Sequence, residues 1–340
     1  MVKVGLVGLG SMGHGHLNNY VRLMEEGAPV KLVAVCDIRP EMLESTAKVT
    51  HNILEEGAGV DMDAFSKYTS FDEMIKNEEL DYVDIVIPTY LHAEHAIKAL
   101  DAGINVLCEK PMALNPDDCK AMIEARDRSG KQLMIAQCLR FWPMYEVLKD
   151  IVVSGELGKA TCGYFFRGGD TPTYAWENWY MDAKKSGGCI LDQHVHDIDM
   201  INYLFGMPKA VATGAVNLID GSFADALSTN YYYDNMIMNA QDDWTLNGGC
   251  GFSMKYRVNF EKGVVICENN KVTVYPVGKD NYQPELGSDD GYYRELVAFI
   301  NAIENGEKIP QRCTPESTLD TIRIADAERR SAILGEMVKF

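Results

Sequence analysis

A glycine-rich turn close to the N-terminus places the strongest constraint on how this chain can fold. Residues 4–16 read VGLVGLGSMGHGH, in which Gly8, Gly10 and Gly13 form the pattern GxGxxG. The pattern follows an apolar run typical of a buried strand and opens a helical pattern that continues to about Glu26. The first glycine permits a tight turn, the second lets a pyrophosphate approach the backbone, and the third lets helix and strand pack closely. We therefore predict a dinucleotide site, with cofactor contacts at Gly8, Gly10, Ser11, Met12 and Gly13.

Two patterns of apolar residues divide the chain. Up to Gln137, strand-like runs alternate with helical patterns, which is typical of a doubly wound parallel sheet. The strand candidates there are 2–7, 30–36, 82–87, 104–108 and 132–136. Beyond Gln137 they follow one another without intervening helices, at 209–217, 228–234, 241–247, 251–260, 263–268 and 271–276. We therefore predict an α/β dinucleotide-binding domain over residues 1–137 and an α+β domain with a mostly antiparallel sheet over residues 138–340.

The charge and cysteine content exclude several classes of partner. The chain of 340 residues carries a formal net charge of −18, which repels nucleic acid and anionic membrane surfaces. No apolar run approaches the roughly 20 residues of a membrane helix, and the N-terminus has no secretory-signal pattern. The nine cysteines are scattered and never form a CxxC pair, which favours reduced side chains. We expect a cytoplasmic protein that binds neither nucleic acid nor membrane.

The second predicted strand ends in Asp37, at the position that hydrogen-bonds the adenosine ribose in dinucleotide-binding folds. A carboxylate there favours NAD, because it repels the 2′-phosphate of NADP. Arg39, two residues further on, could bind such a phosphate, so NADP stays possible. His16, in the first helix, is interpreted as a packing or phosphate-side residue. Further cofactor contacts are predicted after the carboxyl ends of later strands, at Pro88, Thr89, His92, Glu109 and Lys110.

The sequence CEKPM, residues 108–112, places a charged pair directly after a buried strand. Ligands of doubly wound sheets bind beyond the carboxyl ends of the strands, so Lys110 is expected on the cofactor side. A lysine beside an oxidised nicotinamide is suited to polarise a substrate hydroxyl or carbonyl, or to exchange a proton. The alternative interpretation is a solvated surface lysine. The glycine turn upstream makes that alternative less favoured, because it places a cofactor at the same edge of the sheet.

The sequence DQHVHDID, residues 192–199, gathers three Asp and two His within a helix predicted over 188–205. Asp192 and His196, four residues apart, share an edge beside the apolar stripe of that helix. His196 can accept a proton near neutral pH, and Asp192 can orient it or hold a substrate hydroxyl. On a helix His194 and His196 point about 200° apart, so no metal site is predicted. The alternative is an ordinary polar helix face.

An aromatic segment, RGGDTPTYAWENWYMD over residues 167–182, mixes two Trp and two Tyr with polar groups. Aromatic faces beside polar groups suit a sugar or cyclitol ring, although a packed domain interface has the same composition. The predicted substrate-binding residues are Lys110, Arg167, Tyr174, Trp176, Asp192 and His196.

Together these motifs resemble the Gfo/Idh/MocA family, the group of glucose–fructose oxidoreductase and inositol dehydrogenase. The resemblance spans nearly the whole chain and rests on GLGSMGHGH, PTYLH, CEKPM and WYMDAKKSGGCILDQHVHDID. It implies a Rossmann domain, a C-terminal substrate domain whose large open sheet is often used to form homo-oligomers (dimers or tetramers), and reversible alcohol oxidation. It also implies that Lys110, Asp192 and His196 are catalytic. Ile87-Pro88-Thr89 departs from the family's usual Thr-Pro-Asn, which leaves contacts near the nicotinamide ribose open.

The resemblance implies NAD(P)-dependent hydride transfer between nicotinamide and a ring hydroxyl of a sugar or an inositol-like cyclitol. His196 would take the hydroxyl proton, Lys110 would stabilise the developing oxyanion, and Asp192 would hold His196 or a neighbouring hydroxyl. Which of Lys110 and His196 is the formal base stays open. The alternatives are an NAD-dependent glycosidase that oxidises its sugar transiently, an NADP-linked reductase, and a dinucleotide-binding protein without catalysis. The presence of both Lys110 and His196 weighs against the last.

Overall fold

The computed structural model describes residues 1–44 and 60–340, and their contacts separate the chain into two compact units. The chain crosses from the first unit to the second after Gln137, where the sequence predicts a domain boundary, and two later segments return. The first unit contains Met1–Gln137, Tyr174–Trp179 and Tyr292–Leu319. The second contains Cys138–Thr173, Tyr180–Gly291 and Asp320–Phe340.

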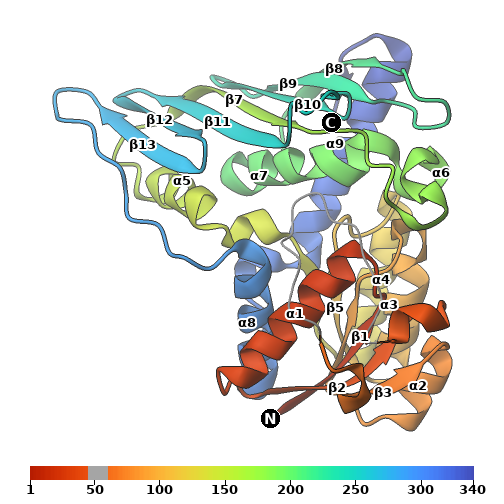
Figure 1. Ribbon diagram of the computed structural model, residues 1–340. Coiled ribbons are helices and arrows are strands. Elements are labelled where there is room, and N and C mark those ends of the chain that lie inside the picture. Colours follow the sequence, from red (N-terminus) through yellow and green to blue (C-terminus); the bar gives the residue numbers. More distant parts are fainter. Residues whose placement is uncertain (45–59) are drawn as a thin grey trace. The chain divides into compact units, whose positions relative to one another are not determined.

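Within the described residues, the first unit holds a parallel sheet of six strands in the order β3-β2-β1-β4-β5-β6 (Figure 1). The strands are β1 (Val2–Val7), β2 (Val30–Cys36), β3 (Ser66–Tyr68), β4 (Tyr82–Ile85), β5 (Asn105–Glu109) and β6 (Leu133–Ala136). This is the strand order of doubly wound dinucleotide-binding sheets. Every residue of β4 is buried, as expected for an inner strand with helices on both faces. The predicted parallel sheet is confirmed.

The first unit also contains helices, one of which is capped at both ends by residues that the sequence supplies. They are α1 (Ser11–Glu25), α2 (Phe71–Asn77), α3 (His92–Asp101), α4 (Pro116–Ser129) and α8 (Gly291–Glu304), with short 3₁₀ turns η1 (Pro40–Leu43), η2 (Met62–Ala64), η3 (Thr89–Leu91) and η7 (Gln311–Cys313). The side chain of Asn115 accepts hydrogen bonds from the first backbone N–H groups of α4, and Gly130 ends that helix with φ of +67°. Helix α8 packs on the sheet through Phe299, whose ring meets Tyr82 edge to face at 4.9 Å.

The second unit is built on an eight-stranded sheet in the order β13-β12-β11-β7-β10-β9-β8-β14. Its described strands are β7 (Ala160–Gly168), β8 (Ala210–Val216), β9 (Ala226–Tyr232), β10 (Ile237–Asp243), β11 (Ser253–Phe260), β12 (Gly263–Glu268), β13 (Lys271–Pro276) and β14 (Val338–Lys339). Only the β7–β10 pair is parallel among the described strand pairs of this sheet, so the predicted mostly antiparallel α+β domain is confirmed. Burial alternates along its strands, which indicates one covered face and one exposed face.

The covered face of this sheet carries helices. They are α5 (Pro143–Ser154), α6 (Ala183–Ser186), α7 (Val195–Phe205) and α9 (Pro315–Leu334), with the turns η4 (Cys138–Phe141), η5 (Trp176–Met181) and η6 (Ile190–His194) in the same part of the sequence. Helix α7 contacts β7 and β10, and α5 contacts β13, on the same side of the sheet in Figure 1. On the other face Ile237 and Tyr275 are exposed. A homo-oligomer formed through this sheet stays a prediction.

No helix in the described part of the chain combines the length and the apolar character that crossing a membrane requires. The cytoplasmic location expected from the sequence stays a prediction.

Candidate active site

The turn between β1 and α1 shows why the sequence needs glycine at three positions. Gly8 has φ of +95°, and a Cβ there would come within 2.4 Å of the Val86 carbonyl oxygen. A Cβ on Gly13 would lie 2.0 Å from the Gly8 carbonyl oxygen, so only glycine lets the helix approach the turn. At Gly10, by contrast, no atom of the described residues lies within 4 Å of the position that a Cβ would occupy. This open backbone at the N-terminus of α1 fits a pyrophosphate.

Asp37, directly after β2, links the glycine turn to the adenosine-ribose side of the fold. Its Oδ2 accepts a hydrogen bond of 2.8 Å from the backbone N–H of Leu9. Arg39 donates from Nε and Nη2 to the same carboxylate, each at 2.9 Å. The guanidinium carbon of Arg39 also lies 5.7 Å from the centre of the Trp176 ring. The two residues predicted to choose between NAD and NADP thus form one ion pair.

We expect Asp37→Ser to weaken NAD binding about 10-fold and to strengthen NADP binding by a similar factor. The substitution removes an acceptor for the ribose hydroxyls and releases Arg39 to bind a 2′-phosphate. Calorimetric titration with each cofactor measures both dissociation constants. The double variant Asp37→Ser, Arg39→Ala should lose the gain in NADP affinity. Unchanged NADP binding in the single variant would contradict this interpretation of the ion pair.

His92, predicted to contact the cofactor, lies between the loops that follow β4 and β5 and is hydrogen-bonded to the backbone of these loops. It begins α3 and is buried, with Nδ1 2.8 Å from the Pro111 carbonyl oxygen and Nε2 2.8 Å from that of Ile87. Burial lowers the pKa of His92, so the ring is neutral at physiological pH and donates to one of these carbonyl groups at a time. The adjoining Pro88 and Thr89 form the turn after β4. Contacts of these three residues with the cofactor stay predictions.

Lys110 directly follows β5, at the carboxyl end of an inner strand of the parallel sheet. Its backbone N–H donates to Glu109 Oε2 at 2.9 Å, and the residue is half-buried. The Lys110–Pro111 peptide bond is cis. Ligands of this sheet type bind outside the carboxyl ends of the strands. Lys110 therefore lies on the ligand-binding edge of the first unit.

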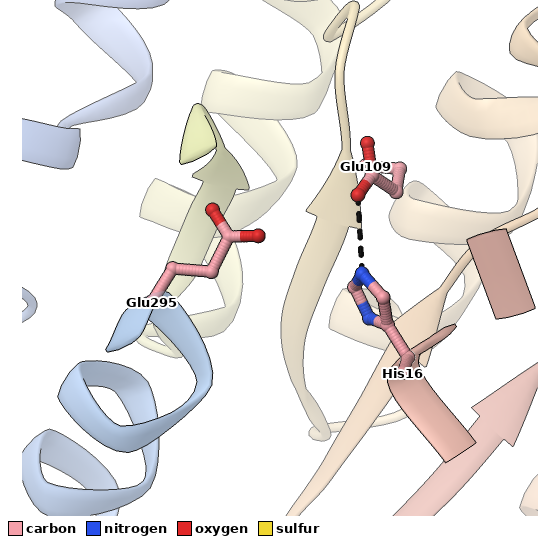
Figure 2. Close-up of side chains that lie close together, drawn as sticks. All are labelled: His16, Glu109 and Glu295. Carbon is pink, nitrogen blue, oxygen red and sulfur yellow. Dashed lines mark hydrogen bonds and ion pairs between the residues drawn. The ribbon is translucent and has the colours of Figure 1, made fainter. Parts of the chain in front are cut away.

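A buried ionic cluster surrounds His16 of α1, next to Glu109 (Figure 2). His16 Nδ1 lies 2.7 Å from Asp84 Oδ2 on β4, and Nε2 lies 3.1 Å from Glu109 Oε1 on β5. Burial alone would lower the pKa of His16, but the Asp84 and Glu109 carboxylates raise it well above its ordinary value. Glu295 of α8 faces the same cluster, and one ligand atom each from His16, Glu109 and Glu295 lie within 4.8 Å of one another. The sequence interpretation of His16 did not include these acids; the available signal was an acid, Asp84, inside an apolar strand.

The DQHVHDID segment is not the uniform helix predicted over 188–205, because the π-helical turn η6 precedes α7. Two consecutive side chains of η6 reach the sheet. Gln193 Nε2 donates to Asp242 Oδ1 on β10 at 2.6 Å. His194 Nδ1 lies 3.1 Å from Asp242 Oδ2, and its Nε2 lies 3.0 Å from Glu328 Oε2 on α9. These bonds stabilise the wider turn, and π turns of this kind are frequent at functional sites.

His194 carries a positive charge at neutral pH. It is fully buried, and the hydroxyl group of Tyr231 on β9 also lies 3.1 Å from its Nε2. Burial alone would lower the pKa of His194, but Glu328 and Asp242 raise it to about 10. Burial in turn raises the pKa of Asp242 to about 6, although the hydrogen bond from His194 opposes that rise. Both ring nitrogens of His194 face protein partners, and the absence of a metal site in this segment stays a prediction.

Two acids of the same segment are bound in buried ion pairs. Asp199 receives hydrogen bonds from Arg140 Nε at 2.7 Å and Nη2 at 2.6 Å. Asp197 receives one from Arg167 Nη2 at 3.3 Å. Arg167 is predicted to bind substrate, but it is only 4% exposed and lies in the core of the second unit. Its charge balances that of Asp197 there, and its contact with substrate stays a prediction.

Asp192 and His196 are the two residues of DQHVHDID that the sequence predicts to be catalytic. Asp192 lies on the π turn and is half-buried, and His196 lies in the first turn of α7 with 8% exposure. The bonds of His194 to the sheet fix the backbone between them. Their catalytic roles stay predictions.

Tyr174 and Trp176, predicted to bind substrate, belong to the segment that packs with the first unit. Trp176 is 37% exposed and lies beside Arg39, on the adenosine-ribose side. The next two residues, Glu177 and Asn178, adopt left-handed backbone angles with φ of 50° and 52°. Consecutive non-glycine residues in this region store strain, which is typical of functional loops. Trp176 therefore lies beside Arg39 within the first unit, and the contacts of Tyr174 and Trp176 with substrate stay predictions.

Comparison with known families agrees with this arrangement. Residues 2–137 match an oxidoreductase family with an NAD-binding Rossmann fold, and residues 145–266 match the Gfo/Idh/MocA C-terminal domain. The chain belongs to the Gfo/Idh/MocA family. The resemblance seen in the sequence, the oxidoreductase class and the NAD cofactor are confirmed.

Relatives of this Gfo/Idh/MocA protein include enzymes with different reactions. An inositol 2-dehydrogenase of Rhizobium meliloti is 27% identical over 350 residues, covering 97% of this chain and 96% of that protein. A 2,7-anhydro-N-acetylneuraminate hydratase of Mediterraneibacter gnavus is 30% identical over 214 residues, covering 62% of this chain and 53% of the relative. The solved structure of levoglucosan dehydrogenase with NADH and levoglucosan has a TM-score of 0.83 at 20% identity and covers 99% of each chain. The last likeness shows the fold.

Proposed function

We propose that this Gfo/Idh/MocA oxidoreductase transfers hydride between a ring hydroxyl of a sugar or cyclitol and NAD. The proposal includes Lys110, Asp192 and His196 as the catalytic residues. The observation that carries it is the end of β5, where Glu109 holds the backbone of Lys110 on the ligand-binding edge of the NAD-binding unit. The inositol 2-dehydrogenase from Rhizobium meliloti, similar over nearly its whole length, supports a cyclitol or sugar as the substrate class.

Each proposed catalytic residue has a role that its chemistry allows. When bound, NAD accepts the hydride that leaves the substrate carbon. The ammonium group of Lys110 donates a hydrogen bond to the substrate oxygen and stabilises the negative charge that develops as the hydroxyl proton leaves. His196 accepts that proton, and Asp192 accepts a hydrogen bond from His196 or from a neighbouring substrate hydroxyl.

A second function is supported by the hydratase relative from Mediterraneibacter gnavus. Addition of water to an anhydro sugar changes no net oxidation state, so an NAD-dependent enzyme with this activity would have to use the cofactor transiently. The same residues would serve that reaction. Oxidation at one carbon would acidify the neighbouring C–H bond, and loss of that proton would expel the oxygen of the anhydro bridge. Water would then add to the double bond, and the hydride would return to the oxidised carbon. In this case NAD would return to its starting state after each turnover.

We expect NADH absorbance at 340 nm to rise when the protein is mixed with NAD and the correct member of a panel that contains myo-inositol, levoglucosan and common hexoses. Mass spectrometry of the same mixtures detects products formed without net NADH. Accumulating NADH supports the dehydrogenase, whereas NAD-dependent conversion without NADH supports transient oxidation. If no polyol, sugar, anhydro sugar or glycoside is converted in either readout, the proposed function is wrong.

A further inference from the structure

We propose that His16 is a positioning residue for Lys110 and acts through Glu109. The proposal rests on the catalytic role of Lys110 given above. His16 itself is fully buried in the core, so we infer that its effect passes through a neighbouring side chain. The structure shows one continuous chain of contacts that can carry it.

The chain of contacts runs from β4 through α1 to the end of β5. Asp84 Oδ2 on β4 lies 2.7 Å from His16 Nδ1, and Glu109 Oε1 on β5 lies 3.1 Å from His16 Nε2 (Figure 2 shows the second contact). The other oxygen of that carboxylate, Oε2, accepts the backbone N–H of Lys110 at 2.9 Å. A histidine ring that donates to a carboxylate from each nitrogen carries both protons and is an imidazolium. The imidazolium of His16 therefore holds the Glu109 carboxylate, and that carboxylate holds the backbone N–H of Lys110.

The remaining groups around His16 hold the ring in one orientation. The hydroxyl of Tyr20, one turn further along α1, donates to Asp84 Oδ2 at 2.8 Å and lies 2.8 Å from the hydroxyl of Tyr82. The Asp84 carboxylate is therefore held by Tyr20 as well as by His16. Glu295 approaches from α8, with a carboxylate oxygen within 4.8 Å of the nearest ligand atoms of His16 and Glu109. Such a surrounding favours the imidazolium and leaves its Nε2–H directed at Glu109.

Glu109 depends on this charge because it is only 4% exposed. A buried carboxylate without a cation either takes up a proton or turns toward water. A protonated carboxyl group accepts the N–H of Lys110 more weakly than a carboxylate does, and a carboxyl group turned toward water no longer accepts it. The three buried ligand atoms of His16, Glu109 and Glu295 would also suit a metal ion, but only with Nε2 deprotonated. The imidazolium supplies the cation of the cluster without one.

The first test follows the Lys110 side chain directly and needs no substrate. His16→Gln and Glu109→Gln are compared with wild type by acetylation with acetic anhydride, with each lysine quantified by peptide mass spectrometry. We expect the Lys110 amine to react at least about 3-fold faster in both variants, because the hydrogen bond that anchors its backbone is weakened. Lys131, a half-buried lysine of the same unit, is the internal reference and should not change. His95→Gln is the matched control, because the described contacts of His95 are with the Leu91 carbonyl oxygen, at 3.0 Å, and with the Phe71 ring.

The second test separates positioning from general structural damage. In the wild-type background, we expect His16→Gln to lower kcat about 10- to 100-fold while changing the Kd of NAD less than about 3-fold. In the Lys110→Met background, the same substitution should lower the residual kcat no further. A merely structural role would lower kcat equally in both backgrounds.

Three outcomes would overturn the proposal. They are unchanged Lys110 acetylation in folded His16→Gln and Glu109→Gln proteins, an equal loss of kcat in the two backgrounds, and full activity of Lys110→Met. The last also removes Lys110 from the proposed function. If no member of the substrate panel is converted, only the proposed function is wrong. The acetylation result still decides whether His16 positions Lys110. If His16→Gln does not fold, Glu109→Gln carries both tests.

Discussion

Lys110→Met is expected to lower kcat by about three orders of magnitude, because it removes the donor that stabilises the developing oxyanion and assists proton transfer. Methionine keeps an unbranched side chain of similar length, so the half-buried position beside Glu109 stays filled. The Kd of NAD should change less than about 3-fold, since the glycine turn and Asp37 are untouched. Steady-state kinetics with the substrate found in the panel, together with calorimetric NAD titration, measures both quantities.

The matched control for this experiment is Lys131→Met, in the same unit and equally half-buried. It should leave kcat within about 2-fold of wild type. Lys110→Arg adds a further distinction, because arginine keeps the charge but does not lose its proton. Substantial activity in the arginine variant would identify the role of Lys110 as electrostatic, with His196 as the base. A Lys110→Met enzyme with wild-type kcat would remove Lys110 from the mechanism.

His194→Leu is expected to lower the free energy of unfolding by about 3–5 kcal/mol. The substitution removes the cation between Asp242 and Glu328, and leaves two carboxylates in a site that excludes water. Chemical denaturation followed by circular dichroism measures the loss. His95→Leu, which removes a single hydrogen bond to a backbone carbonyl, is the control and should cost about 1 kcal/mol.

The pH dependence gives a second measurement of the same interaction. The pKa of His194 is raised from an ordinary 6.5 to about 10 in the folded protein. Its stabilisation is therefore fully present below about pH 6.5 and is lost as the pH rises through about 10. The difference in the free energy of unfolding between wild type and His194→Leu should therefore shrink as the pH rises from about 6.5 to about 10.

A triple variant, His194→Leu with Asp242→Asn and Glu328→Gln, tests whether the charges cause the loss. Replacing a whole buried ionic group is much less damaging than breaking one, so most of the stability should return. A His194→Leu loss below about 1 kcal/mol, with no dependence on pH between 6.5 and 10, would show that His194 is not an imidazolium.

The parts of the fold that the sequence predicts well are those set by neighbouring residues. The glycine turn, Asp37 after β2 and the Glu109-Lys110-Pro111 ending of β5 depend on local strand, turn and helix signals, and the structure has each at the expected element. Strand β10 shows the limit of the same signals. The sequence predicts it at 241–247, whereas it spans Ile237–Asp243. Its position is set by antiparallel pairing with β9, in which Ile237 lies opposite Tyr232 and Asp243 opposite Ala226.

The parts that could not be predicted depend on partners distant in the sequence. His194 binds Asp242, 48 residues away, and Glu328 on a helix near the C-terminus. Helical periodicity assigns a direction to His194 but contains no information on these acids, so the π turn was missed. The pairing of Arg167 with Asp197, 30 residues away, is likewise not visible in local sequence patterns. Aromatic composition could not reveal that Trp176 returns to the first unit.

The first unit takes part of its core from the far end of the chain, and this orders events during synthesis. Phe299 of α8 packs on Tyr82 of β4, and Glu295 of the same helix joins the cluster at His16. A ribosome that has released only residues 1–137 has therefore delivered the sheet but not the helix that closes one of its sides. The nucleotide-binding unit can be completed only after most of the second unit has been made. Residues 1–137 expressed alone or fused to another protein would therefore lack α8, which is part of the core of this unit.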